Sequence, residues 1–306
     1  MRKTLCLLLA LPLLAPAQAP EPIFPMVSPT GAQLAWVEGS TWRIWIAHAD
    51  GSGARVFGPA WPQGIGQIAW TRRGMIVDSN YTLFRLSTAG KRTKLAVVGD
   101  QFFSVGATRA AVGSGQGSGP VTVVDLLTRK VTRIGSPTVA NGEPSLAPDG
   151  RRLAWGGPGG IWVGPSSGGP AQLLIRNGAC PSWSPNGRSI AYLERGDLHV
   201  VASGGGPGRK LVARAGGCGT FAWSPDSKTI AFTPQRIDTV SIATARVTKS
   251  PPLGRVAGGL VWGRDGSELY VTTRPVADEQ ALNNCTNLWR LDARTLRGRV
   301  LVRGCP

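Results

Sequence analysis

The residues best suited to acid–base chemistry are few and scattered in this sequence. Only two histidines occur, His48 and His199, each in the expected third strand of a different repeat copy, and His199 alternates with apolar residues as in a packed strand. Most of the 17 acidic residues stand in turn sequences, as Asp149, Asp226 and Asp265 do. An aspartate at such a position caps its own backbone and needs no substrate. The pattern indicates no Ser-His-Asp arrangement and no paired acids, so we expect a protein that is not an enzyme.

Cysteines offer the other candidate chemistry. Of the five, Cys6 lies in an N-terminal apolar run, which leaves Cys180, Cys218, Cys285 and Cys305. Their spacings match no zinc pattern, and we expect no metal. We also expect no cofactor, because the glycine-rich stretch at 113–119 lacks the Lys-Ser/Thr ending of a phosphate loop. Four cysteines in an exported chain predict two disulfides, with three possible pairings.

The first residues predict export. Met1-Arg2-Lys3 is followed by the apolar run Leu5–Leu14 and then by Ala15-Pro16-Ala17-Gln18-Ala19, the layout of a secretory signal. The run is about half the length of a membrane span, and no later stretch is longer, so we expect no membrane-spanning segment. Cleavage fits after residue 17 or after residue 19. We expect a signal peptide at 1–17 and one domain at 18–306, in a periplasmic or secreted protein.

The elements that position these residues belong to a repeat. One copy runs through Cys180–Ala213, with short apolar segments separated by turn sequences. In its first turn, Ser184–Gly187, Pro and Asn-Gly suit the backbone angles. The four expected strands are Pro181–Trp183, Ser189–Leu193, Asp197–Val201 and Arg209–Ala213. The tryptophans fall in such strands and are expected in the core.

The same pattern recurs along the chain, with two degraded copies near residues 72 and 105. The second position of the first turn falls at residues 29, 72, 105, 148, 185, 225 and 264. Four short strands per roughly 40 residues are typical of a propeller, whereas a β-sandwich would not repeat one turn before the same apolar triplet. The predicted fold class is all-β, a β-propeller of about seven four-stranded antiparallel blades, with six as the alternative.

Two strings of the repeat carry a resemblance. Trp183-Ser184-Pro185-Asn186-Gly187 and Trp223-Ser224-Pro225-Asp226, each followed by an apolar triplet, resemble the propeller repeats of the TolB family. The resemblance implies a periplasmic or secreted scaffold whose propeller docks proteins or peptides. Similar repeats occur in prolyl oligopeptidase-like enzymes, which carry a separate hydrolase domain, but we expect no such domain here because no span outside the repeats could hold it. No functional residue is carried over from either family.

Positive charge dominates the composition. The chain has 34 Lys and Arg against 17 Asp and Glu, a net charge of +17. Many of the basic residues fall on the expected fourth strands, where charge blocks edge-to-edge pairing. The other interpretation is attraction to an anionic cell-envelope polymer, by a binder or an enzyme. Aromatic residues do not interleave with the charges, so nucleic acid is not an expected partner.

The cysteine positions favour two particular pairings. Cys285 precedes the third strand of the last copy and Cys305 follows its fourth, so antiparallel pairing brings them to one end. Cys180 and Cys218 occupy equivalent positions in neighbouring copies. Their bond requires Cα atoms within about 7 Å, a distance that neighbouring inner strands need not reach.

The longest insertion in the repeat lies at Arg274–Thr286. Long loops in compact domains are often functional, and insertions in repeat proteins often gather on a binding face. The candidate partner-binding residues within it are Asp278, Glu279, Gln280, Asn283 and Asn284. We hypothesise that this loop and the adjacent channel mouth dock a protein or peptide partner of the cell envelope. The alternative is a tolerated surface insertion.

Overall fold

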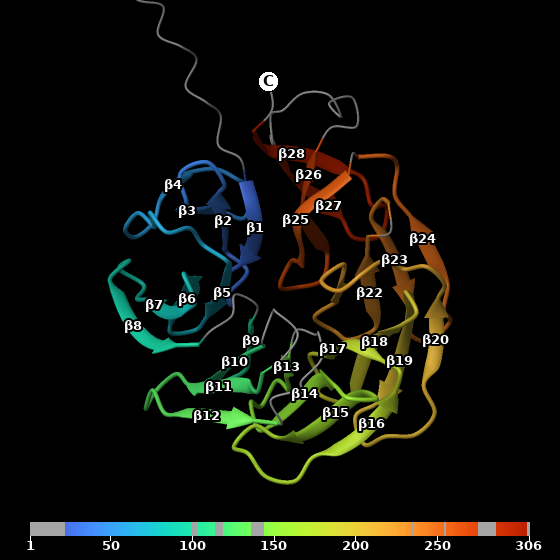
Figure 1. Cartoon of the computed structure of the whole chain (residues 1–306). Coiled ribbons are helices and arrows are strands. Elements are labelled where there is room, and N and C mark those ends of the chain that lie inside the picture. Colours follow the sequence, from blue (N-terminus) through green and yellow to red (C-terminus); the bar gives the residue numbers. More distant parts are fainter. Residues whose placement is uncertain are drawn as a thin grey trace, which may run out of the picture.

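Seven four-stranded antiparallel sheets form a ring in the computed structural model (Figure 1). The structure describes residues 22–98, 103–113, 119–135, 144–233, 235–253, 255–274 and 286–304, with side chains left undescribed at 255–258. Within these ranges all regular elements are strands, and no helix is long and apolar enough to cross a membrane. The prediction of a seven-bladed β-propeller is confirmed.

Each blade is one continuous stretch of chain whose strands pair in sequence order, from the ring's centre outward. Blade 1 contains β1 (Pro22–Val27), β2 (Gln33–Glu38), β3 (Arg43–His48) and β4 (Arg55–Val56). Blade 2 contains β5 (Gln67–Thr71), β6 (Gly74–Ser79), β7 (Thr82–Leu86) and β8 (Arg92–Val97). Blade 3 contains β9 (Phe103–Val105), β10 (Arg109–Val112), β11 (Val121–Asp125) and β12 (Val131–Ile134). Blade 4 contains β13 (Ser145–Leu146), β14 (Arg152–Gly157), β15 (Gly160–Pro165) and β16 (Gln172–Arg176).

The other three blades follow the same plan. Blade 5 contains β17 (Ala179–Trp183), β18 (Ser189–Glu194), β19 (Asp197–Ala202) and β20 (Arg209–Val212). Blade 6 contains β21 (Phe221–Trp223), β22 (Thr229–Phe232), β23 (Asp238–Ser241) and β24 (Val247–Lys249). Blade 7 contains β25 (Arg255–Trp262), β26 (Glu268–Arg274), β27 (Asn287–Asp292) and β28 (Gly298–Arg303).

The repeated turn is held by a buried serine hydroxyl in three blades. The serine that opens the turn accepts a hydrogen bond from the backbone N–H five residues later. The pairs are Ser28 with Gln33 at 3.0 Å, Ser184 with Ser189 at 3.0 Å, and Ser224 with Thr229 at 2.9 Å. The turn's fourth residue has positive φ, +70° at Gly187, which glycine adopts at low cost. Local sequence thus fixes where the second strand begins.

The core is divided among the seven interfaces between blades. Each interface holds one cluster of buried apolar side chains. Trp183, Ile190 and Tyr192 of blade 5, for example, pack against Ala154 and neighbouring residues of blade 4. A four-stranded sheet has two apolar faces and can bury both only by stacking on two neighbours. The ring shape follows from that requirement.

The ring closes without exchange of a strand, because blades 1 and 7 are each made of consecutive strands. Their seam contains Leu34 and Trp36 of blade 1 with Tyr270 and Leu288 of blade 7. The Thr286 hydroxyl also donates to the carbonyl oxygen of Pro22 at 2.7 Å. The seam is therefore held by packing and side-chain hydrogen bonds, with no chain connection across it.

Two tryptophans differ from the expectation that all of them lie in strands, since Trp42 stands in the turn before β3 and Trp61 in a linker. Trp61 belongs to the linker between β4 and β5, and only 1% of it is exposed. Its ring packs edge-on against Phe84, and the Arg92 guanidinium lies 5.2 Å from its centroid. A ten-residue linker replaces part of a sheet here, and its large apolar ring supplies the core that the two-residue strand β4 does not.

Candidate functional site

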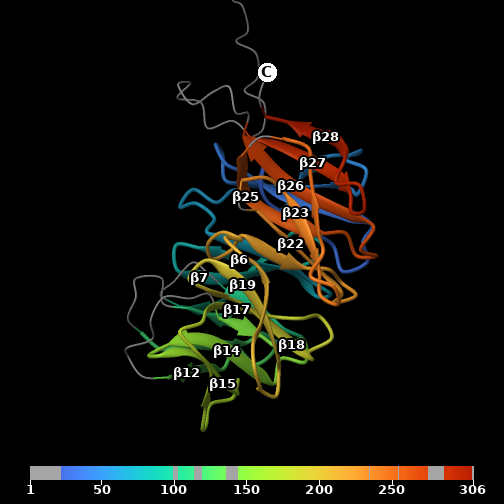
Figure 2. The same ribbon diagram turned by 90° about the vertical axis from the view of Figure 1, so that its right-hand side faces the viewer.

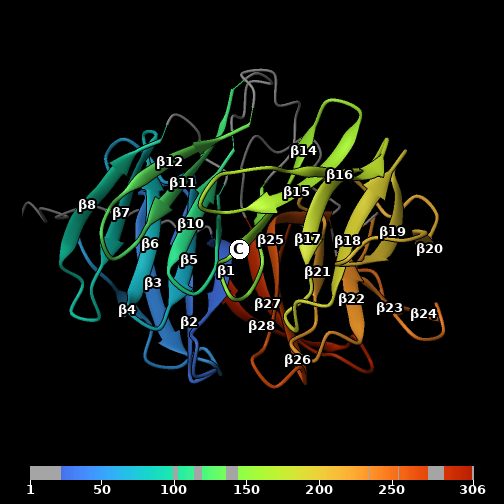
Figure 3. The same ribbon diagram turned by 90° about the horizontal axis from the view of Figure 1, so that it is seen from below.

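The two faces of the ring differ in what they carry. First-to-second and third-to-fourth turns of each blade lie on one face, here called the turn face. Second-to-third loops and blade-to-blade linkers lie on the other, the linker face. Figures 2 and 3 show the ring edge-on, with the blades side by side. The meander within every blade produces this division, since antiparallel strands reverse direction at each step.

The inner strands of blades 3 to 6 surround a small pocket at the axis of the ring, on the linker-face side. Its volume is about 140 Å³. We call it the channel-mouth pocket; it is lined by Phe103, Ser104, Pro144, Ser145, Cys180, Pro181, Ser182, Gly219 and Phe221. Four different blades contribute, so the pocket depends on closure of the ring around them.

Three serines in this pocket occupy equivalent positions of the repeat. Ser104, Ser145 and Ser182 each pair with an alanine of the second strand in their own blade. The Ser104 hydroxyl accepts from the backbone N–H of Leu146 at 2.9 Å, and the Ser145 hydroxyl accepts from that of Trp183 at 3.0 Å. A serine that accepts one hydrogen bond keeps its own proton for donation. These hydroxyls therefore connect neighbouring inner strands and can each still donate a hydrogen bond to a bound partner.

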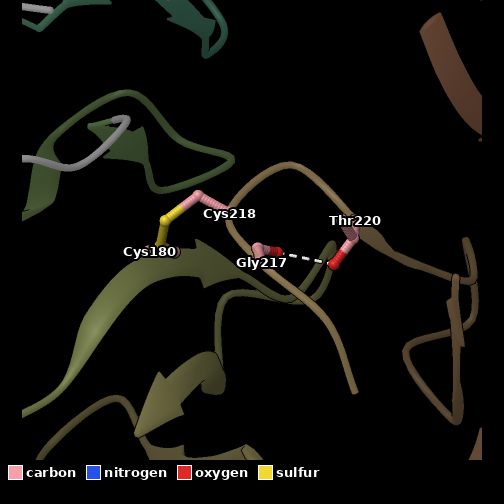
Figure 4. The surroundings of a disulfide bond; sticks show 4 residues. All are labelled: Cys180, Gly217, Cys218 and Thr220. Atoms are coloured by element: carbon pink, nitrogen blue, oxygen red, sulfur yellow. Dashed lines mark hydrogen bonds between the residues drawn. A yellow bond between two sulfur atoms is a disulfide. The ribbon is translucent and has the colours of Figure 1, made fainter. Parts of the chain in front are cut away.

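A disulfide closes one side of the pocket. Cys180 in β17 is joined to Cys218 in the linker that follows blade 5, with Cα atoms 5.4 Å apart (Figure 4). Cys180 has φ +53° and lies where the β17–β18 register shifts. A bulge of this kind redirects a side chain, which explains how an inner strand reaches the linker. The separation lies within the range that a disulfide allows.

The linker carrying Cys218 is also held by hydrogen bonds. The N–H of Arg214 donates to Asp197 at 2.9 Å, and the N–H of Ala215 donates to the Gly196 carbonyl at 2.8 Å. Beyond the disulfide, the Thr220 hydroxyl donates to the Gly217 carbonyl at 2.5 Å (Figure 4). The linker at the edge of the channel-mouth pocket is therefore held in place on both sides of Cys218.

Several sequence-predicted residues lie outside the described ranges. These are Cys285, Cys305 and the candidate partner-binding residues Asp278, Glu279, Gln280, Asn283 and Asn284. The strand ends that flank the insertion, Arg274 of β26 and Asn287 of β27, lie on the linker face. The pairing of Cys285 with Cys305 and the role of the insertion stay predictions.

The two histidines do not meet. His48 ends β3 in blade 1, and His199 lies in β19 of blade 5 with its ring stacked on Tyr192 at 5.2 Å between centroids. Among the described residues, no three His, Cys, Asp or Glu side chains gather as metal ligands would. His48 is exposed, whereas His199 is half-buried against Tyr192, so the two histidines share no site.

The larger hollows lie between blades on the turn face. A groove of about 500 Å³ separates blades 1 and 2, and one of about 570 Å³ separates blades 6 and 7. Asp226 and Asp265 line the second groove. Hydrogen bonds from Ser224 lower the pKa of Asp226, and hydrogen bonds from Ser267 lower the pKa of Asp265. Both carboxylates cap their own turns, and a general acid needs the opposite pKa shift.

The fold defines the class of protein as a β-propeller, and comparison with solved structures agrees. A TolB structure from Acinetobacter baumannii matches at 18% identity and TM-score 0.52, over 72% of this chain and 61% of that one. Kuenenia stuttgartiensis hydrazine synthase matches at 14% identity and TM-score 0.68, over 92% and 98%. A puromycin-hydrolysing peptidase of Mycobacterium tuberculosis matches at 13% identity and TM-score 0.68, over 94% and 54%.

These likenesses concern the fold alone. The chain spans less than two thirds of the TolB and peptidase chains. No protein-family model matches the sequence, and no curated protein matches it. The structures with this fold include two enzymes and a TolB protein, and one fold can serve many functions. The function must therefore be argued from the residues of this chain.

Sequence reasoning did not single out the pocket serines or Phe221. The sequence analysis placed residue 105 in the first turn of the third copy, whereas the structure places it in β9 and begins the turn at Gly106. With this correction of two residues, Ser104, Ser145 and Ser182 stand at one position of the repeat. The disulfide and the channel mouth on the linker face were among the expectations, and the structure places Cys180 in both.

Proposed function

We propose that this chain is an exported, non-enzymatic β-propeller that binds a protein or peptide partner at the channel mouth of its linker face. The observation that carries the proposal is the channel-mouth pocket itself. It combines the aromatic rings of Phe103 and Phe221 with the serine hydroxyls and with a linker that the disulfide holds at the edge of the pocket. Apolar walls with a few placed polar groups are typical of binding sites.

The size of the pocket favours a side chain of a partner over a whole small molecule. Small-molecule sites usually measure about 300–1,000 Å³, and the pocket measures about 140 Å³. An aromatic or aliphatic anchor of a protein partner would fill it, and buried anchors of this kind carry much of the energy of an interface. The linker-face loops around the pocket would form the rest of the contact.

Two further observations support the proposal. One fold neighbour belongs to a structure of the mitotic checkpoint complex, at 16% identity and TM-score 0.62, over 91% of this chain and 97% of that one. Export is supported by the N-terminal pattern at 1–17 and by the Cys180–Cys218 disulfide, since disulfides persist in oxidising compartments.

Site-specific photo-crosslinking tests the binding site. A benzoylphenylalanine at Phe221 keeps an aromatic ring in the pocket, and the same residue at Leu127, which is 47% exposed on the turn face, is the matched control. In living cells the Phe221 position should yield a discrete crosslinked protein that is absent for Leu127. Equal products at both positions, or none at Phe221, would contradict the proposal.

A deletion tests the predicted insertion separately. Replacing residues 276–283 with a short Gly-Ser segment should abolish capture of the protein that Phe221 crosslinks, while the melting temperature changes little. Undiminished capture by this variant would exclude the insertion and leave the channel-mouth pocket as the binding site.

A further inference from the structure

The outer strands of all seven blades carry charge of one sign. β4, β8, β12, β16, β20, β24 and β28 together contain ten Lys and Arg residues and no Asp or Glu. Every one of these ten residues is exposed, and each outer strand has at least one. We call this set the basic rim. Figure 1 shows these strands along the circumference of the ring.

Little of this charge is neutralised locally. In the described ranges, Lys210 is the one rim residue in an ion pair, with Asp197 at 2.5 Å. Arg209 donates to the carbonyl oxygen of Ile242, and Arg92 lies over the rings of Trp61 and Phe84. The other rim residues have no acidic neighbour within ion-pairing distance among the described residues.

Protection of sheet edges explains the presence of charge but not its sign. A charged side chain of either sign hinders pairing of an edge strand with another chain. Acidic residues are not excluded from strands here, since eight of them stand in inner and middle strands, Glu38 and Glu268 among them. Their absence from all seven outer strands therefore indicates a requirement for positive potential.

The geometry of the rim limits what can neutralise it. A flat lipid surface touches only one arc of a convex ring. Duplex nucleic acid has a persistence length of about 500 Å, whereas a compact domain of this length has a radius of gyration of about 19 Å. Single-stranded nucleic acid prefers aromatic rings between the charges, and the rim presents none in its outer strands. A flexible polyanion can follow the whole circumference.

We propose that the basic rim binds a flexible anionic polymer carrying phosphate or carboxylate groups, wound along the outer strands. This surface is separate from the channel-mouth pocket, so the ring can hold a polymer at its circumference and a protein partner on its linker face. Arginine suits both groups because its planar fork accepts a phosphate or a carboxylate in two hydrogen bonds.

Charge reversal at two matched surfaces tests the proposal. The rim variant combines Lys94→Glu, Arg133→Glu, Arg176→Glu and Arg299→Glu. The control combines Arg72→Glu, Arg151→Glu, Arg188→Glu and Arg264→Glu, all exposed on the turn face. Both variants change the net charge equally. Glutamate on the outer strands also keeps the edges charged, so both variants should keep the oligomeric state of the unaltered protein and a melting temperature close to its own.

Binding is measured by fluorescence anisotropy with labelled inorganic polyphosphate and labelled poly-glutamate. The rim variant should lose at least tenfold more affinity than the control for the preferred polymer. Its log–log salt slope should fall by about 3, given about 0.7 for each of four lost contacts on a single-stranded polyanion. The preference between the two polymers identifies phosphate or carboxylate as the recognised group.

Three outcomes would overturn the proposal. Equal losses in both variants would show that net charge, not the rim, drives binding. Rim-dependent binding to anionic vesicles or to duplex DNA that matches or exceeds binding to the flexible polymers would assign the rim to another class of partner. Failure of the unaltered protein to bind either polymer at low salt would leave the basic rim with edge protection alone.

Discussion

A single hydroxyl group at the start of the repeated turn makes two hydrogen bonds that backbone groups do not supply. Ser224 is 3% exposed, and its Oγ accepts from the N–H of Thr229 at 2.9 Å while donating to Asp226 at 2.6 Å. Blade 4 has Ala147 in the same place and keeps the backbone hydrogen bonds of the turn and the bond from the Arg151 N–H to Asp149, without a hydroxyl at the first position. The comparison within one chain isolates what the hydroxyl contributes.

Removing this hydroxyl should destabilise the ring. Ser224→Ala leaves the Thr229 N–H without its side-chain acceptor, and we expect a loss of about 1–2 kcal/mol in the free energy of unfolding. For a domain of this size that lowers the melting temperature by about 2–4 °C per kcal/mol. Scanning calorimetry measures this decrease in the melting temperature. Ser267→Ala is the control, because Ser267 makes a similar bond to Asp265 at an exposed position. Equal shifts in both variants would contradict the role of burial.

Turn aspartates should make the protein sensitive to acid. Three of these carboxylates accept hydrogen bonds that lower their pKa in the folded state. The donors are the Ser224 hydroxyl for Asp226, the Ser267 N–H for Asp265 and the Thr295 N–H for Asp292. A carboxyl whose pKa is lower in the folded state stabilises it above the unfolded pKa of about 3.9 and loses this effect as pH falls further. The melting temperature should therefore fall steeply below about pH 4.

Asparagine at the three positions tests the cause. It keeps the acceptor oxygen without titrating, as Asn186 does in blade 5, where its Oδ1 accepts from the N–H of Arg188 at 3.0 Å. Circular dichroism melts from pH 7 to pH 2.5 should show a shallower acid decline in the triple Asn variant. An unchanged decline would assign the acid sensitivity to other groups.

At the scale of elements, the disulfide joins a strand to the linker of the next blade. It closes a loop across a sequence separation of 38 residues, for which chain entropy predicts up to about 4 kcal/mol of stabilisation. The variant Cys180→Ala with Cys218→Ser should therefore unfold at lower urea, with the free energy of unfolding reduced by about 2–4 kcal/mol. Addition of reductant to the unaltered protein should reproduce the change.

Peptide mapping without reduction is the accompanying measurement. We expect one peptide pair linked through Cys180 and Cys218 and a second through Cys285 and Cys305. A link between Cys180 and Cys285 would overturn both pairings.

The strands themselves were predictable because their boundaries are written locally. Pro and Asn-Gly in Ser184–Gly187 specify a turn whatever surrounds it, and the apolar triplet after it must be buried. Trp61 was not predictable in the same way. Its linker has no strand period, and the ring is buried because Phe84 and Arg92 of blade 2 happen to cover it. Burial by distant partners leaves no local pattern.

At the scale of the whole molecule, the repeat gave the blade count but not the channel mouth. Six copies of the turn are visible in the sequence, even where Arg72 replaces the proline, and the third copy keeps only the strand pattern. The pocket instead joins residues as distant as Phe103 and Phe221, and only the curvature of the ring brings four inner strands together. The positive charge of the fourth strands was predicted from the sequence, whereas its arrangement along one circumference follows from the ring.

The weakest interface of the ring should be the seam between blades 1 and 7. Every other pair of neighbouring blades is connected by a linker, whereas the seam has only packing and hydrogen bonds. Tyr270 lies at its centre, 1% exposed, and its hydroxyl lies 2.7 Å from Glu268 Oε2 and 3.1 Å from the Ala49 carbonyl oxygen. Loss of this side chain should therefore open the ring locally before the whole domain unfolds.

Tyr270→Ala tests this directly, with Phe232→Ala in the cluster between blades 5 and 6 as the control. Each change removes a large buried ring and should cost about 3–5 kcal/mol. Hydrogen exchange should separate them, because a seam that opens locally exposes β1, β2, β26 and β27 while β14 and β15, on the far side of the ring (Figure 1), stay protected. In the control the linker between blades 5 and 6 keeps the neighbours together, and protection should fall evenly. If Tyr270→Ala also lowered protection evenly in all blades, the seam would be no weaker than the linked interfaces, and the ring would unfold as one cooperative unit.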